Sequence, residues 1–120
     1  MANLGNRAIG AIELRPKRKF YDYKAKYKKS SRTEHIMPAE ISKLKYSEVL
    51  RISQKAYKIL KCRGIARCDF RFYKNKFFLL EVNTQPGMTS LSLVPEIAEY
   101  KNISFKQLVN WMVKDASLNR

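Results

Sequence analysis

The sequence is poor in the residues that build metal clusters, disulfide frameworks and membrane spans. It has two cysteines, Cys62 and Cys68, and one histidine, His35, in 120 residues. Two cysteines six positions apart, with no second pair, predict neither a zinc cluster nor a disulfide scaffold. His35 has no partner at a spacing typical of a catalytic dyad and is interpreted as a loop residue. The first twenty residues are too polar for a signal peptide, and no apolar run could span a membrane, so we expect a cytoplasmic protein.

Acidic residues are also scarce. The chain has 10 acidic and 25 basic side chains, a net charge of +15, and residues 1–63 hold 17 of the basic and 5 of the acidic ones. Such a field attracts phosphate-bearing partners. A composition of 45% hydrophobic and 12% aromatic residues is typical of a globular domain. At this length we expect one domain with a modest core.

The first half of the chain predicts a strand, a long loop and a helix. Residues 8–14 predict the strand, whereas residues 1–6 offer little to hold it in place. Residues 20–38 interleave lysines with tyrosines, and the two interpretations are a nucleic-acid-binding surface and a solvated charged loop. Residues 42–62 predict the helix, with Ser42 or Ser47 as the N-cap. Its apolar stripe consists of Val49, Ile52, Ala56, Ile59 and Leu60.

Residues 65–73 and 76–83 alternate in polarity and predict two strands of a hairpin. A two-residue turn sets Phe70 opposite Leu79, a register that mixes polar and apolar faces. A three-residue turn at 74–76 sets Phe70 opposite Leu80 and Asp69 opposite Glu81, so that one face is apolar and the other polar. We therefore predict the three-residue turn, with a positive φ at Asn75 or a neighbour.

Two carboxylates facing each other destabilise a sheet unless a cation neutralises them. Asp69, Glu81 and the amide of Asn83 supply oxygen ligands, which suit Mg²⁺ or Mn²⁺ better than zinc or copper. The alternative is a solvated face in which arginine or lysine side chains pair with the carboxylates. The residues alone leave both interpretations open.

The C-terminal third predicts a loop and two helices. Residues 84–92 contain Pro86-Gly87, a turn signal that also lets a ligand approach the backbone closely. A short helix is expected at 94–100, and a longer one begins at Ser104 with a capping box. We expect the apolar stripe of the last helix to pack on the apolar face of the hairpin, against Cys68, Phe70 and Leu80.

Three segments together resemble the C-terminal part of D-alanine:D-alanine ligase, an ATP-grasp enzyme. They are Phe20-Tyr-Asp-Tyr-Lys-Ala-Lys-Tyr27, Met37-Pro38-Ala39, and Arg67-Cys-Asp69 followed by Leu80-Glu-Val-Asn-Thr-Gln-Pro-Gly-Met-Thr-Ser-Leu-Ser92. The resemblance covers nearly the whole chain. It implies an α+β fold, a mostly antiparallel sheet with helices packed on one face, equivalent to the C-terminal half of an ATP-grasp domain spanning residues 1–120.

The resemblance also implies roles for individual residues in the ATP-dependent joining of two D-alanines. In the 20–38 active-site loop, Lys26 would reach the nucleotide phosphates and Tyr27 would hold the closed loop. In the 65–93 hairpin and loop, Asp69, Glu81 and Asn83 would hold two Mg²⁺ or Mn²⁺ ions. Arg67 and the Gly87 N–H would stabilise the oxyanion. Ser92 would bind the carboxylate of the acceptor D-alanine, beside Leu93.

Nothing in the sequence resembles the N-terminal and central domains of that family. We therefore expect the isolated chain to be inactive, either as one piece of a split ligase that needs a separate chain carrying those domains, or as a gene remnant. The alternative, from another class of function, is a small basic nucleic-acid-binding module, although the resemblance argues against a nucleic-acid partner. No membrane partner is expected.

Overall fold

A computed structural model describes residues 1–16 and 33–118. The strands are β1 (Ala2–Leu4), β2 (Arg7–Gly10), β3 (Glu13–Pro16), β4 (Thr33–Ile36), β5 (Ile65–Tyr73) and β6 (Lys76–Asn83); the helices are α2 (Lys43–Ile59), α3 (Leu93–Tyr100) and α4 (Phe105–Asp115). The expected α+β class with antiparallel pairing is confirmed. No described helix is both long enough and apolar enough to cross a membrane.

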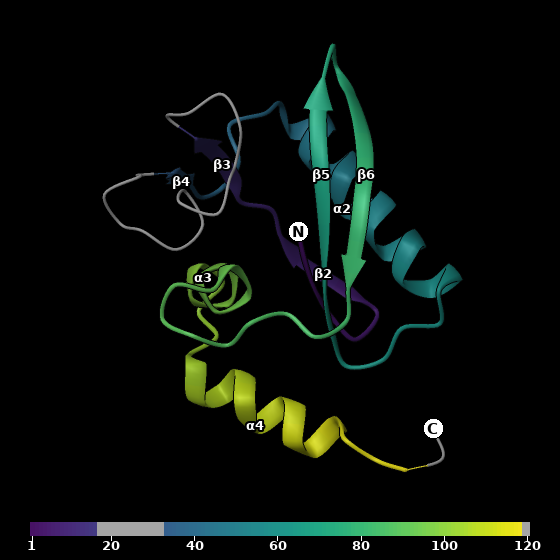
Figure 1. Cartoon of the computed structure of the whole chain (residues 1–120), viewed down its shortest axis with the longest axis vertical. Coiled ribbons are helices and arrows are strands. Elements are labelled where there is room, and N and C mark those ends of the chain that lie inside the picture. Colours follow the sequence, from purple (N-terminus) through teal and green to yellow (C-terminus); the bar gives the residue numbers. More distant parts are fainter. Residues whose placement is uncertain (17–32, 119–120) are drawn as a thin grey trace.

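The main sheet has the strand order β2-β1-β5-β6, and β3 pairs with β4 in a separate two-stranded sheet (Figure 1). The segment expected to be one strand, residues 8–14, is divided between β2 and β3. Residues 2–4, which were not expected to hold that strand in place, form β1 inside the main sheet, pair with β2 and are buried. Because β1 pairs with both β2 and β5, it joins the hairpin to the N-terminal strands.

The helices lie on both faces of the main sheet, so the prediction of a single helical face is wrong in this detail. Ala2 and Leu4 pack with Ile97 of α3 and Leu108 of α4 in one buried cluster. Asn3, which points to the opposite face, donates a hydrogen bond to Ser53 Oγ of α2 over 2.9 Å. Alternation along β1 therefore assigns α2 to one face and α3 and α4 to the other.

Helix α2 begins as predicted, with Ser42 accepting a hydrogen bond from the Lys45 N–H. Its buried face differs from the predicted stripe. Ser53 and Tyr57 are buried together with Val49, whereas Ile59 is 67% exposed. Polar side chains can be buried there because they are hydrogen-bonded, as the Tyr57 hydroxyl is to the Gly64 carbonyl over 2.8 Å.

Helix α4 has the predicted Ser104 capping box, but it does not pack on the apolar hairpin face. Cys68 packs with Val49 of α2, on the far side of the sheet from α4. The only fully buried side chain of α4 is Leu108, and it contacts the β1 and α3 cluster. The expected contact with Leu80 is also wrong, because Leu80 is 65% exposed.

The two cysteines should differ sharply in reactivity. Cys68 is fully buried, and burial raises the pKa of its thiol, so less of the reactive thiolate forms at a given pH. Cys62 is partly exposed. We expect a thiol reagent such as DTNB at pH 8 to modify one cysteine rapidly in the native chain and the second only after denaturation. Rapid modification of both in native buffer would contradict the burial of Cys68, and a Cys62→Ser variant identifies the fast site.

Candidate functional site

The hairpin of β5 and β6 combines the two registers that the sequence offered. Its turn has two residues, Lys74 and Asn75, with φ values of 46° and 65°, so the three-residue turn is wrong and the positive φ is confirmed. Phe70 pairs with Leu79, and yet Asp69 still faces Glu81. A β-bulge at this point makes both pairings possible, because it inserts one extra residue into β6.

The bulge places four polar side chains on one face, here called the polar hairpin face: Arg67, Asp69, Glu81 and Asn83. Arg67 pairs with Asn83, as predicted, and is also opposite Ala2, whose side chain points toward α3 and α4. Directly opposed residues share a face of a sheet. The polar hairpin face therefore lies on the side of the sheet that carries α3 and α4.

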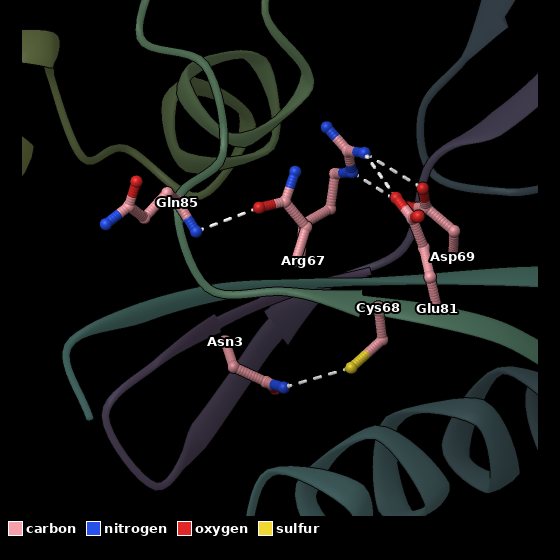
Figure 2. Close-up of polar contacts among 7 residues, drawn as sticks. Asn3, Arg67, Cys68, Asp69, Glu81 and Gln85 are labelled. Carbon is pink, nitrogen blue, oxygen red and sulfur yellow. Dashed lines mark hydrogen bonds and ion pairs between the residues drawn. The ribbon is translucent and has the colours of Figure 1, made fainter. Parts of the chain in front are cut away.

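Arg67 contacts both carboxylates of this face (Figure 2). Its Nε and Nη2 donate to the two oxygens of Asp69 over 2.8 and 2.9 Å, and Nη2 also lies 3.3 Å from Glu81 Oε1. The hydrogen bond to Asp69 is the main cause that raises the pKa of the Arg67 guanidinium. The carboxylates remain accessible, since the side chains of Asp69 and Glu81 are 33% and 58% exposed.

The third oxygen donor, Asn83, connects this face to the loop at residues 84–92. Its Oδ1 accepts a hydrogen bond from the Gln85 N–H over 2.8 Å. Within the residues that the structure describes, no cluster of three or more His, Cys, Asp or Glu side chains is suited to a metal ion. The oxygen donors that this face offers to a divalent cation are the two carboxylates and the amide oxygen of Asn83.

The loop at residues 84–92 leads from β6 to α3. A Cβ atom added to Gly87 would lie 2.9 Å from Ser92 Oγ, so only glycine fits without displacing that side chain. Ser92 Oγ accepts a hydrogen bond from the Thr89 N–H over 2.9 Å. Leu93 is the first residue of α3. The structure thus brings Gly87 and Ser92 together, and Asn83 is tied to the same loop.

Two predicted site residues, Lys26 and Tyr27, lie outside the described residues, as does most of the 20–38 loop. The strands that flank it, β3 and β4, pair with each other. His35 lies in β4 and not in a loop, and its Nδ1 lies 2.8 Å from Glu96 Oε2 of α3. Sequence reasoning missed this contact because 61 residues separate the partners.

The comparisons with known proteins agree on one family. The family model described as "D-ala D-ala ligase C-terminus" matches residues 1–114. The chain belongs to this family. It is 54% identical over 120 residues to a D-alanine–D-alanine ligase of Pelagibacter ubique and 46% identical over 121 residues to one of Paramagnetospirillum magneticum. These matches cover 100% and 96% of this chain but only 40% and 39% of the two ligases.

Solved structures of this ligase family share the fold. A crystal structure of D-alanine–D-alanine ligase from Bacillus anthracis complexed with ATP superimposes with a TM-score of 0.78 and 31% identity, over 95% of this chain and 37% of that one. The ATP-grasp resemblance inferred from the sequence motifs is thereby confirmed. The comparisons give no support to the nucleic-acid-binding alternative.

Proposed function

We propose that this chain forms the C-terminal wall of a ligase active site that uses ATP to join two D-alanines. The observation that carries the proposal is the polar hairpin face, in which the β-bulge sets Asp69 opposite Glu81 within a family match that spans residues 1–114. ATP would phosphorylate the carboxylate of one D-alanine. The amine of the second would then displace phosphate through a tetrahedral intermediate and give D-alanyl-D-alanine.

Asp69, Glu81 and Asn83 are the residues that would hold two Mg²⁺ or Mn²⁺ ions. Two exposed carboxylates and one amide form the kind of oxygen donor set that these hard cations prefer. When bound, the ions would offset the negative charge of the nucleotide phosphates. Arg67 and a divalent cation would compete for the same carboxylate oxygens, because Arg67 already contacts both groups.

The remaining residues would position and stabilise the reacting groups. Arg67 and the Gly87 N–H would face the developing oxyanion, where a single donor is typically worth about 3 to 4 kcal/mol. Ser92 would bind the carboxylate of the acceptor, with Leu93 beside it. Lys26 would neutralise nucleotide phosphates, and Tyr27 would hold the closed loop.

This chain would supply only part of the active site, because it spans about 40% of the length of the curated relatives it matches. An acyl phosphate must be protected from water, and one wall of a cleft cannot exclude it. We therefore propose that the chain acts with the remaining ligase segments, on the same polypeptide or on a separate one, and is inactive without them. Because the proposed reaction consumes ATP, we propose that the chain acts in the cytoplasm.

The proposal can be tested with a grafted ligase, in which this chain replaces the matching 40% of the Pelagibacter ubique enzyme. We expect the grafted ligase to form D-alanyl-D-alanine from D-alanine and ATP, and the isolated chain to form none. Chromatographic detection of the dipeptide is the readout. A folded grafted ligase that makes no dipeptide would reject the proposed function.

A further inference from the structure

Ser92 is an N-cap residue that does not cap its helix. Ser42 and Ser104, at the starts of α2 and α4, each accept a hydrogen bond from a backbone N–H of the first turn. Ser92 occupies the same position before α3 and makes no such bond. Because a serine N-cap usually satisfies one of these N–H groups, the different orientation of the Ser92 hydroxyl requires another partner.

That partner is Thr89, which contacts Ser92 in three ways. The Thr89 N–H donates to Ser92 Oγ over 2.9 Å, the two hydroxyl oxygens lie 2.8 Å apart, and the Ser92 N–H donates to the Thr89 carbonyl over 3.0 Å. Thr89 Oγ1 also accepts a hydrogen bond from the Leu91 N–H over 3.3 Å. Each hydroxyl oxygen therefore already accepts one backbone hydrogen bond.

Counting donors and acceptors shows what this pair can offer to a ligand. A hydroxyl has one hydrogen and two acceptor lone pairs. If Thr89 donates to Ser92, both lone pairs of Ser92 are occupied and its hydrogen is free; if Ser92 donates, the same is true of Thr89. In either arrangement the pair presents one free O–H. An acceptor such as a carboxylate at Ser92 would select the arrangement in which Thr89 donates.

We propose that Thr89 is a positioning residue that fixes Ser92 as a hydrogen-bond donor toward the acceptor carboxylate. This inference rests on the proposed function, since it assigns a partner to the Ser92 role. The resulting chain of bonds runs from the Leu91 N–H through Thr89 to Ser92, and each bond in such a chain polarises the next. Gly87 supports the arrangement, because a side chain there would displace the Ser92 hydroxyl.

Three variants of the grafted ligase test the inference: Thr89→Val, which removes the hydroxyl at nearly constant shape, Thr89→Ser, which keeps it, and Ser92→Ala. We expect Thr89→Val to raise the half-saturating D-alanine concentration several-fold, because Ser92 loses the neutral hydrogen bond that orients its hydroxyl toward the carboxylate. Ser92→Ala should raise it at least as much. The maximal rate should change less than the half-saturating concentration, and Thr89→Ser should behave like the unmodified grafted ligase.

The outcomes separate this inference from the proposed function. If Ser92→Ala weakens D-alanine binding and Thr89→Val does not, the role of Thr89 is rejected and the ligase function stands. If Ser92→Ala has no effect, or no dipeptide forms at all, the site assignment fails and the inference fails with it. A Thr89→Val variant with a lower melting temperature and equal losses in rate and binding would show a structural role and overturn the proposal.

Discussion

Replacing Glu81 by glutamine in the grafted ligase is expected to lower dipeptide formation on the order of a thousandfold. The exchange keeps the shape of the side chain but removes the charge that would hold a divalent cation. Losing several kcal/mol of stabilisation of the transferring phosphoryl group corresponds to a rate loss of about this size. Initial rates of dipeptide formation at saturating ATP provide the measurement.

Glu48→Gln is a matched control. Glu48 lies on α2, on the opposite face of the sheet, and forms an ion pair with Lys45 that is partly exposed. An exposed pair of this kind contributes about 1 kcal/mol or less to stability, so the activity should stay unchanged. Full activity of the Glu81→Gln variant would show that Glu81 is not a metal ligand.

Replacing Leu108 by alanine is expected to lower the free energy of unfolding of the chain by about 2–5 kcal/mol. Leu108 is fully buried in the cluster that joins α4 to α3 and β1, so its truncation would leave a cavity between three elements. Because a domain is typically stable by only about 5–15 kcal/mol, the loss would be a large share of the total.

Urea denaturation followed by circular dichroism measures this effect, and Val113→Ala is the control. Val113 also lies on α4, but it is 68% exposed, so its truncation should change the stability by less than about 1 kcal/mol. Equal losses in the two variants would contradict the packing of α4 on α3 and β1.

The hairpin shows how far local sequence patterns reach. Alternating polarity predicted both strands and the pairing of Asp69 with Glu81. It could not predict that a two-residue turn and a β-bulge together produce this pairing, because one inserted residue has the same effect on the register as a longer turn. The residues of the face were therefore predictable, whereas the exposed position of Leu80 was not.

Contacts between distant segments were the main source of error. Residues 2–4 are too few to predict a strand, and their place in the sheet depends on pairing with both β2 and β5. Helix α4 showed a clear capping box, but an apolar stripe does not reveal which face of a sheet it covers. The link between His35 and Glu96 likewise exists only once β4 and α3 are side by side.

The candidate site was predictable where a motif is contiguous. Gly87 and Ser92 are five residues apart, and in the structure a Cβ atom added to Gly87 would meet the Ser92 hydroxyl. Thr89 was missed because threonine is common in loops, and its role follows only from the hydrogen bonds that it makes. A Thr and a Ser three residues apart before a helix were the signal that could have indicated it.

Binding of Mn²⁺ to the grafted ligase in the presence of ATP tests the central claim most directly, because Mn²⁺ bound to protein is measurable by electron paramagnetic resonance without any turnover. The account predicts bound Mn²⁺ in the grafted ligase and its loss in the Asp69→Asn, Glu81→Gln double variant, with Glu48→Gln unchanged. Equal Mn²⁺ binding by the double variant and the unmodified grafted ligase would contradict the proposal that the polar hairpin face binds the metal ions and the nucleotide.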